Sequence, residues 1–173
     1  MTHILPLDSQ SDSAIDALLD AAFGMDRRGR TAYTIRAGMH WVPELSYAVL
    51  DDDGVLAGTL QSWPVALHGA DGATSPLVMV GPVAVRPDHQ SSGLGRAMMD
   101  AVVRDARAQA TPPLMMIGDP EYYGRFWGFS AAGTGGWDAP GPFEARRLLA
   151  LIVDGGALPD VGMLGPRVSR RVA

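Results

Sequence analysis

The spacing of apolar residues changes along the chain and divides it into short helical and extended segments. From Ile15 to Phe23 the apolar residues recur at helical spacing, and Ser11 or Ser13 is placed to cap the start of a helix. Elsewhere, short apolar runs lie between turns that contain Gly, Pro or Asp, which is the pattern of strands. The predicted strands are 2–7, 46–50, 55–63, 77–85, 114–117 and 147–153, and the further predicted helices are 27–40, 94–108 and 120–127.

Turn signals and the C-terminal composition set the expected organisation. Residues 51–54, Asp-Asp-Asp-Gly, are predicted to join two strands as a hairpin, and a second turn is expected around residues 71–72. Residues 154–173 are rich in glycine and proline, and an irregular tail is expected there. A length of 173 residues is typical of one domain, so we predict a single domain over residues 1–173 with its core in 2–153.

Composition narrows the classes of protein that the chain can belong to. The hydrophobic fraction of 47% and the charged fraction of 19% are values of globular proteins. A net charge of −5 with no long basic run argues against a nucleic-acid partner. The longest apolar stretches are too short to span a membrane, and the N-terminus lacks a signal-peptide pattern. Since there is also no cysteine to form a disulfide, a cytoplasmic location is predicted.

Residues 83–96, Val-Ala-Val-Arg-Pro-Asp-His-Gln-Ser-Ser-Gly-Leu-Gly-Arg, carry the strongest chemical signal. A predicted strand ends at Val85, a polar turn with Gly93 and Gly95 follows, and a predicted helix comes next. Glycines let the main chain approach a phosphate closely, and the first N–H groups of a helix point at such an anion. The segment therefore predicts phosphate or pyrophosphate binding, while a tight turn without a ligand is the alternative.

Three common phosphate-binding loops can be compared with this turn. The nucleoside-triphosphate loop needs a lysine, and the chain contains none. The dinucleotide fingerprint fits Gly93 and Gly95, but Met98 stands where its third glycine belongs. The acyl-CoA loop, Gln/Arg-x-x-Gly-x-Gly/Ala, matches Gln90, Gly93 and Gly95 without gaps. Together with the preceding Val-Arg-Pro (85–87), this segment resembles the GNAT superfamily of acyl-CoA-dependent N-acyltransferases.

The resemblance covers roughly residues 2–153 and implies both a fold and a cosubstrate. The implied fold class is α/β (α+β), the GNAT fold, with a mixed, mostly antiparallel sheet of about seven strands and about four helices. In that fold the fourth and fifth strands splay apart, and the pantetheine arm of acetyl-CoA lies between them. The resemblance implies that the backbone of Val83, Ala84 and Val85 pairs with pantetheine. The residues implied to hold the pyrophosphate are Gln90, Ser91, Ser92, Gly93, Leu94, Gly95 and Arg96.

A second motif lies at residues 118–129, Gly-Asp-Pro-Glu-Tyr-Tyr-Gly-Arg-Phe-Trp-Gly-Phe. A helix that ends at glycine, with an aromatic residue next, is a common C-terminal arrangement. The motif looks like that of the GNAT branch with Asp-x-x-Tyr-Tyr-x-Arg-Phe-Gly-Phe, but Trp127 is inserted before the glycine. Either a bulge in the helix absorbs this residue or the register of the tyrosines shifts. The resemblance implies a tyrosine that protonates the leaving CoA thiolate, and Tyr123 is favoured over Tyr122.

The group that deprotonates the amine is not identified by any pattern. Glu44, Asp119, Glu121 and His68 are candidates, and ordered water is an alternative. Asp119 is followed by Pro120, so capping of the next helix is its favoured role. The histidines lack the spacing of metal ligands, and no metal is expected.

The predicted activity is direct transfer of an acetyl group from acetyl-CoA to an amine of a small molecule or peptide. A non-catalytic acyl-CoA-binding or sensing module on the same fold is the alternative. The tyrosine pair favours the enzyme, whereas Trp127 and the missing base favour the module. Segments 24–43 and 133–143 contain glycine, proline and aromatic residues and are expected to flank the acceptor. No nucleic-acid or membrane partner is expected, and a homodimer is left open.

Overall fold

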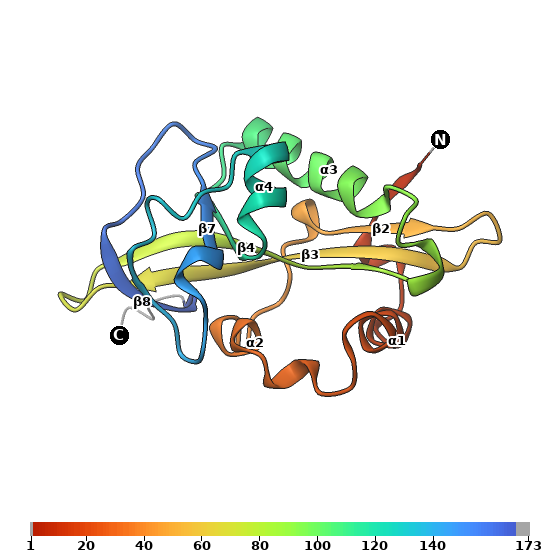
Figure 1. Cartoon of the computed structure of the whole chain (residues 1–173), viewed down its shortest axis with the longest axis horizontal. Coiled ribbons are helices and arrows are strands. Elements are labelled where there is room, and N and C mark those ends of the chain that lie inside the picture. The colour runs from red at the N-terminus through yellow and green to blue at the C-terminus, as the bar shows by residue number, and fades with distance from the viewer. Residues whose placement is uncertain (1, 169–173) are drawn as a thin grey trace. The chain divides into compact units, whose positions relative to one another are not determined.

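A computed structural model describes residues 2–168 of the chain (Figure 1). The strands are β1 (Ile4–Pro6), β2 (Tyr47–Leu50), β3 (Leu56–His68), β4 (Thr74–Val85), β5 (Leu114–Ile117), β6 (Gly136–Asp138), β7 (Leu148–Leu151) and β8 (Val161–Pro166). The α-helices are α1 (Asp12–Phe23), α2 (Thr31–Ile35), α3 (Leu94–Gln109) and α4 (Pro120–Trp127). Short 3-10 helices are η1 (Leu7–Ser9), η2 (Arg27–Gly29), η3 (Pro43–Leu45), η4 (Pro87–His89) and η5 (Ala145–Arg147).

The strands form one mixed, mostly antiparallel sheet. Hydrogen-bonded neighbours follow the order β1-β2-β3-β4-β5-β7, and β8 pairs with both β3 and β6. The pairs β1–β2, β2–β3, β3–β8 and β5–β7 are antiparallel, while β4–β5 and β6–β8 are parallel. The predicted fold class and its four helices are therefore confirmed, and the sheet has eight strands instead of about seven.

The parallel pairing of β4 with β5 is short. It joins Val78 to Leu114 and Met79 to Met115, whereas β4 continues to Val85. Pro82 lies in the continuing part of β4, where it has no N–H to donate to a neighbouring strand. Limited pairing at this position agrees with the predicted splay of the fourth and fifth strands.

The structure divides into two compact units that share β3 and β4. The first unit comprises Met1–Gly29, Trp41–Ser62 and Val80–Ala110, and the second comprises Arg30–His40, Trp63–Met79 and Thr111–Ala173. β3 therefore passes from the first unit to the second after Ser62, and β4 returns to the first at Val80.

In the first unit, α1 and α3 cover opposite faces of the strands (Figure 1). Leu18 of α1 is buried in a cluster with Ala48 of β2 and Ala84 of β4. On the other face, the Tyr47 hydroxyl of β2 donates to the Asp105 carboxylate of α3, with an O···O distance of 2.7 Å. Adjacent residues of a strand point to opposite faces, so Tyr47 and Ala48 face different helices as the pleat requires.

The second unit contains a strand that the local sequence did not reveal. Residues 154–173 were expected to be irregular, but β8 pairs with β3 from Val65 opposite Pro166 to His68 opposite Met163. The expectation was wrong for β8 because main-chain pairing with a distant strand needs no local apolar run, and glycine and proline occur in β8 itself. Residues 169–173 of the expected tail lie outside the described residues.

Other boundaries differ from the prediction in length. The expected helix 27–40 is divided into η2 and the five-residue α2. Strands β3 and β4 are longer than predicted, because they extend toward each other to the turn around Asp71 and Gly72. Within the described residues, no helix combines the length and the apolar character needed to cross a membrane.

Candidate functional site

The turn that follows β4 has the backbone geometry of an anion site. Gly93 precedes α3 in the left-handed conformation, with φ of +79° and ψ of 10°. Its carbonyl accepts the first main-chain hydrogen bond of α3, from the N–H of Ala97 at 3.0 Å. The N–H groups of the first helical residues have no acceptor within the helix, so they can donate to a ligand. A side chain at Gly93 would be strained at this φ, which is the physical reason for a glycine.

The start of α3 lies against the end of β4. A β-carbon built on Gly95 would lie 3.7 Å from Cγ2 of Val85 and 3.9 Å from Cγ1 of Val83. Ala84, between them, is buried in the cluster on the opposite face with α1. The first unit therefore contains both the strand end and the turn that were predicted to hold the cofactor.

The polar residues of the turn are open to solvent. Gln90, Ser91, Ser92, Gly93 and Arg96 are exposed, and Leu94 and Gly95 are half-buried. The turn is nevertheless ordered internally, since the N–H and the hydroxyl of Ser92 both donate to the carbonyl of His89. An exposed but shaped main-chain turn is suited to a large anion such as a pyrophosphate.

Two residues near the turn were missed by the sequence reasoning. The Arg86 guanidinium donates to the Asp51 carboxylate at 2.8 Å and thereby connects the turn to the β2–β3 hairpin. Arg86 was visible only as part of a Val-Arg-Pro motif, and no local signal pairs it with a residue so distant in sequence.

The tyrosines lie on α4 in the second unit, and the helix has the predicted boundaries. Asp119 caps it, because its carboxylate accepts from the N–H of Glu121 at 3.1 Å, and Pro120 occupies the first helical position. Hydrogen bonding from Glu121 holds the pKa of Asp119 below its ordinary value. A carboxylate that is engaged and acidic in this way is a poor base, so the expected capping role is confirmed.

Tyr122 and Tyr123 have different environments. The Tyr122 side chain is 38% exposed, whereas Tyr123 is half-buried. The ring of Tyr123 lies over Gly118 at the end of β5, and its centroid is 6.4 Å from that of Phe129. Burial raises the pKa of the Tyr123 hydroxyl, and the neighbouring Tyr122 and Asp119 raise it further. No hydrogen bond to that hydroxyl is seen within residues 2–168, so it is available to a ligand.

The inserted Trp127 lengthens α4 without a bulge. The helix is regular through Trp127 and ends at Gly128, which is left-handed with φ of +85°. The N–H of Gly128 donates to the carbonyl of Gly124 at 3.0 Å, and that of Phe129 donates to the carbonyl of Tyr123 at 3.4 Å. Of the two alternatives, the structure has the shifted register, in which Tyr123 lies five residues before the terminal glycine.

The remaining base candidates have structural partners or lie in solvent. Glu121 forms an ion pair with Arg146. The His68 ring contacts the carbonyl of Pro166 through Nε2 at 3.0 Å. Glu44 is an exposed residue of η3. None of these arrangements is that of a poised base, and in residues 2–168 no group of His, Cys, Asp and Glu could hold a metal ion.

Parts of the two segments predicted to flank the acceptor contact each other in the second unit. The Thr31 hydroxyl of α2 donates to the carbonyl of Pro142 at 2.6 Å. The Arg36 guanidinium lies 3.9 Å from the ring centre of Tyr33 and 4.1 Å from that of Trp63. Arg36 and Trp63 are both buried, so this contact between a cation and aromatic rings belongs to the packing of the unit.

Two further tryptophans, Trp41 and Trp137, have structural hydrogen bonds. The indole N–H of Trp41 donates to Asp8 at 3.0 Å, and that of Trp137 donates to the carbonyl of Pro159 at 2.8 Å. Trp137 is also buried, which makes a packing role sufficient for it.

Comparisons with known proteins give one consistent result. The family model described as acetyltransferase (GNAT) domain matches residues 6–132. The chain is similar to the uncharacterized N-acetyltransferase YhbS of Escherichia coli (strain K12), with 27% identity over 128 residues, which are 74% of this chain and 71% of that protein.

Two solved structures share the fold. One is the GNAT family N-acetyltransferase YhbS from Escherichia coli in complex with CoA, with a TM-score of 0.69 and 22% identity, covering 96% of this chain and 89% of that one. The other is a GNAT family acetyltransferase from Brucella melitensis in complex with acetyl-CoA, with a TM-score of 0.67 and 23% identity, covering 94% and 93%.

Proposed function

Because the chain belongs to the acetyltransferase (GNAT) family, we propose that it transfers an acetyl group from acetyl-CoA to an amine. The observation that carries the proposal is the left-handed Gly93 at the head of α3, with the end of β4 beside it. The main chain from Ser91 to Arg96 would hold the pyrophosphate, and the backbone of Val83 to Val85 would pair with pantetheine. Two solved relatives in complex with CoA or acetyl-CoA support this choice of cosubstrate.

The proposed reaction is a direct attack without an acyl-enzyme. The amine nitrogen forms a bond to the thioester carbonyl carbon, and the C–S bond then breaks to release the CoA thiolate. The thiolate takes a proton from the Tyr123 hydroxyl, which regains one from solvent. The proton lost by the amine goes to water, since the carboxylates that were considered are engaged in a cap or an ion pair or are exposed.

Tyr123 is the better of the two tyrosines for this role. Its hydroxyl has no partner within the described residues, and its raised pKa keeps it protonated at neutral pH. Tyr122 points in a different direction from Tyr123, toward solvent, since adjacent residues of a helix differ by about 100° in direction and Tyr122 is exposed.

For the acceptor, we propose that α2 and the segment 133–143, which contains β6, form one wall. Their contact through Thr31 and Pro142 supports this assignment, and the stacked Arg36 and Trp63 lie in the same unit. The acceptor is an amine of a small molecule or peptide. A cytoplasmic location stays a prediction from the sequence, and a homodimer stays open.

Calorimetric titration with acetyl-CoA and a CoA-release assay over a broad panel of amines test the proposal. Binding together with amine-dependent release of CoA is the expected result. Binding without release for any amine would favour the non-catalytic acyl-CoA-binding module, and absence of binding would contradict both.

A further inference from the structure

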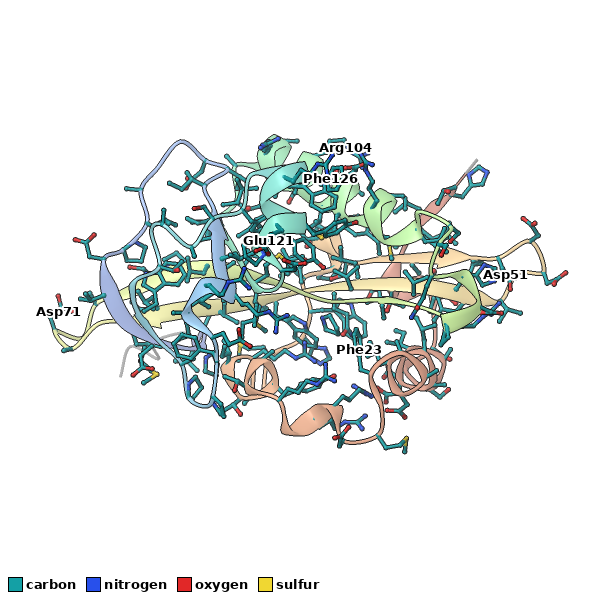
Figure 2. All side chains as sticks on the ribbon, viewed as in Figure 1. Phe23, Asp51, Asp71, Arg104, Glu121 and Phe126 are labelled. Carbon is teal, nitrogen blue, oxygen red and sulfur yellow. The ribbon has the colours of Figure 1, made fainter. Side chains whose placement is uncertain are left out.

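The side chain of Arg86 joins two segments of the first unit that are distant in sequence. Arg86 lies between β4 and η4, and its backbone N–H donates to the carbonyl of Ala57 in β3 at 2.8 Å. The guanidinium then reaches in two directions. It donates to Asp51 at 2.8 Å in the β2–β3 hairpin, and to Asp88 at 2.7 Å in the turn. In Figure 2, Asp51 lies at the hairpin end of the strands, next to that turn.

The Asp51 carboxylate is held by hydrogen bonds within its own hairpin as well as by Arg86. One carboxylate oxygen, Oδ1, accepts from the N–H groups of Asp53 and Val55, each at 2.9 Å. The other oxygen, Oδ2, accepts from Arg86. The Asp51 side chain is only 11% exposed, and the hydrogen bond from Val55 followed by that from Arg86 lowers its pKa. The hairpin therefore offers a fixed, ionised carboxylate to the guanidinium.

His89 carries the connection from Arg86 into the phosphate turn. Arg86 Nη2 and His89 Nε2 are 2.7 Å apart. A guanidinium can only donate, so His89 Nε2 must be the acceptor and the ring proton must be on Nδ1. The carbonyl of His89 in turn accepts from the N–H of Ser92 at 3.1 Å, and Gly93 follows. A continuous series of contacts thus runs from Asp51 to the residue at which α3 begins.

We propose that Arg86 and Asp51 form a positioning pair that holds the pyrophosphate turn in its binding conformation without touching the cofactor. This inference rests on the proposed cofactor site. Isolated exposed ion pairs contribute little to stability, so a network of this size around one guanidinium points to local ordering as its purpose. An exposed turn that is already ordered loses less conformational entropy when the ligand binds, so the affinity is higher.

The size of the effect follows from the ordered fraction of the turn. If loss of the pair leaves the binding conformation in about one molecule in ten, the dissociation constant for CoA rises about tenfold. The KM for acetyl-CoA should rise by a similar factor while kcat changes little, because the pair contacts no reacting atom.

The test compares five variants and two probes by calorimetric titration. Asp51→Asn keeps one oxygen that can accept from the hairpin N–H groups, but its other polar group is an NH2, which cannot accept from Arg86. Arg86→Met removes the donor. Asp53→Asn is the control in the same hairpin, since Asp53 contributes its backbone N–H to the turn. The probes are CoA and pantetheine, which lacks the pyrophosphate.

We expect Asp51→Asn and Arg86→Met to bind CoA more weakly and pantetheine as before. Asp53→Asn should bind both probes as the unmodified protein does. The double variant should be no worse than either single variant, and Arg86→Lys should restore part of the affinity. Unchanged CoA affinity in Asp51→Asn would overturn the inference, whether or not Arg86→Met folds. The proposed function fails separately, if the unmodified protein does not bind CoA.

Discussion

The ring of Tyr123 lies directly on Gly118, so that a β-carbon at Gly118 would come within 2.8 Å of both Cδ2 and Cε2. Real β-carbons are not found so close to other atoms, so any side chain at this position would displace the ring. Gly118 directly follows β5 and α4 begins two residues later, so the ring lies between a strand end and its own helix. The absence of a side chain at Gly118 therefore allows the Tyr123 ring to occupy this position.

Gly118→Ala is expected to lower kcat by roughly 10–100-fold, because a displaced general acid loses its alignment with the leaving sulfur. The affinity for CoA should change little, since the phosphate turn is unaffected. Gly29→Ala is the matched control, as a β-carbon there also meets no atom within 4 Å and Gly29 lies outside α2 and the segment 133–143. Steady-state kinetics with unchanged kcat in Gly118→Ala would contradict the assignment.

Tyr123→Phe should lower kcat by about 10²–10⁴-fold and leave acetyl-CoA affinity nearly intact, since it removes only the proton donor. Tyr122→Phe should have the smaller effect, because Tyr122 is exposed. Burial raises the pKa of Tyr123 above the ordinary value of about 10, so ionisation of this tyrosine should not reduce kcat below about pH 10. If the double variant Tyr122→Phe/Tyr123→Phe turned over normally, neither tyrosine would be the general acid, and solvent would protonate the thiolate.

Gly93→Val should abolish strong binding of CoA, because a side chain at this point stands where the anion approaches. A β-carbon at Gly93 meets no protein atom within 4 Å, so the fold should survive with a cost of about 1–2 kcal/mol for the left-handed φ of +79°. Gly155→Val serves as control, since Gly155 has a similar φ of +74° and equally open surroundings. Denaturation should show similar losses of stability in Gly93→Val and Gly155→Val. Calorimetry should show a loss of CoA affinity only in Gly93→Val.

Two buried threonines should respond in opposite ways to replacement by valine. The Thr59 hydroxyl is buried without a hydrogen-bond partner within residues 2–168, whereas that of Thr134 donates to the carbonyl of Leu148 at 2.7 Å. Thr59→Val should raise the free energy of unfolding by about 1 kcal/mol, and Thr134→Val should lower it by about 1–3 kcal/mol. Urea denaturation measures both changes. Destabilisation by Thr59→Val would mean that a buried water satisfies the hydroxyl.

Local features of the chain could be predicted from residues that are neighbours in sequence. The helix Pro120–Trp127 was predicted with the boundaries that the structure has, because Asp119, Pro120 and Gly128 are start and stop signals within one segment. The turn from Gln90 to Gly95 belongs to the same class, since its left-handed glycine and the helix after it depend on a few adjacent residues.

Features that depend on distant residues were decided only by the tertiary structure. β8 forms because β3 offers it main-chain partners about a hundred residues away in sequence, and its own glycines and proline gave no sign of a strand. The sequence likewise left open whether the inserted Trp127 makes a bulge in α4 or shifts the register of the tyrosines. The structure has a regular helix. The partner of Arg86 was hidden for the same reason, because a guanidinium can reach any nearby carboxylate, and folding alone brings Asp51 within 2.8 Å. Short-range signals thus determined the helix Pro120–Trp127 and the turn from Gln90 to Gly95, whereas long-range pairing determined β8 and the partner of Arg86.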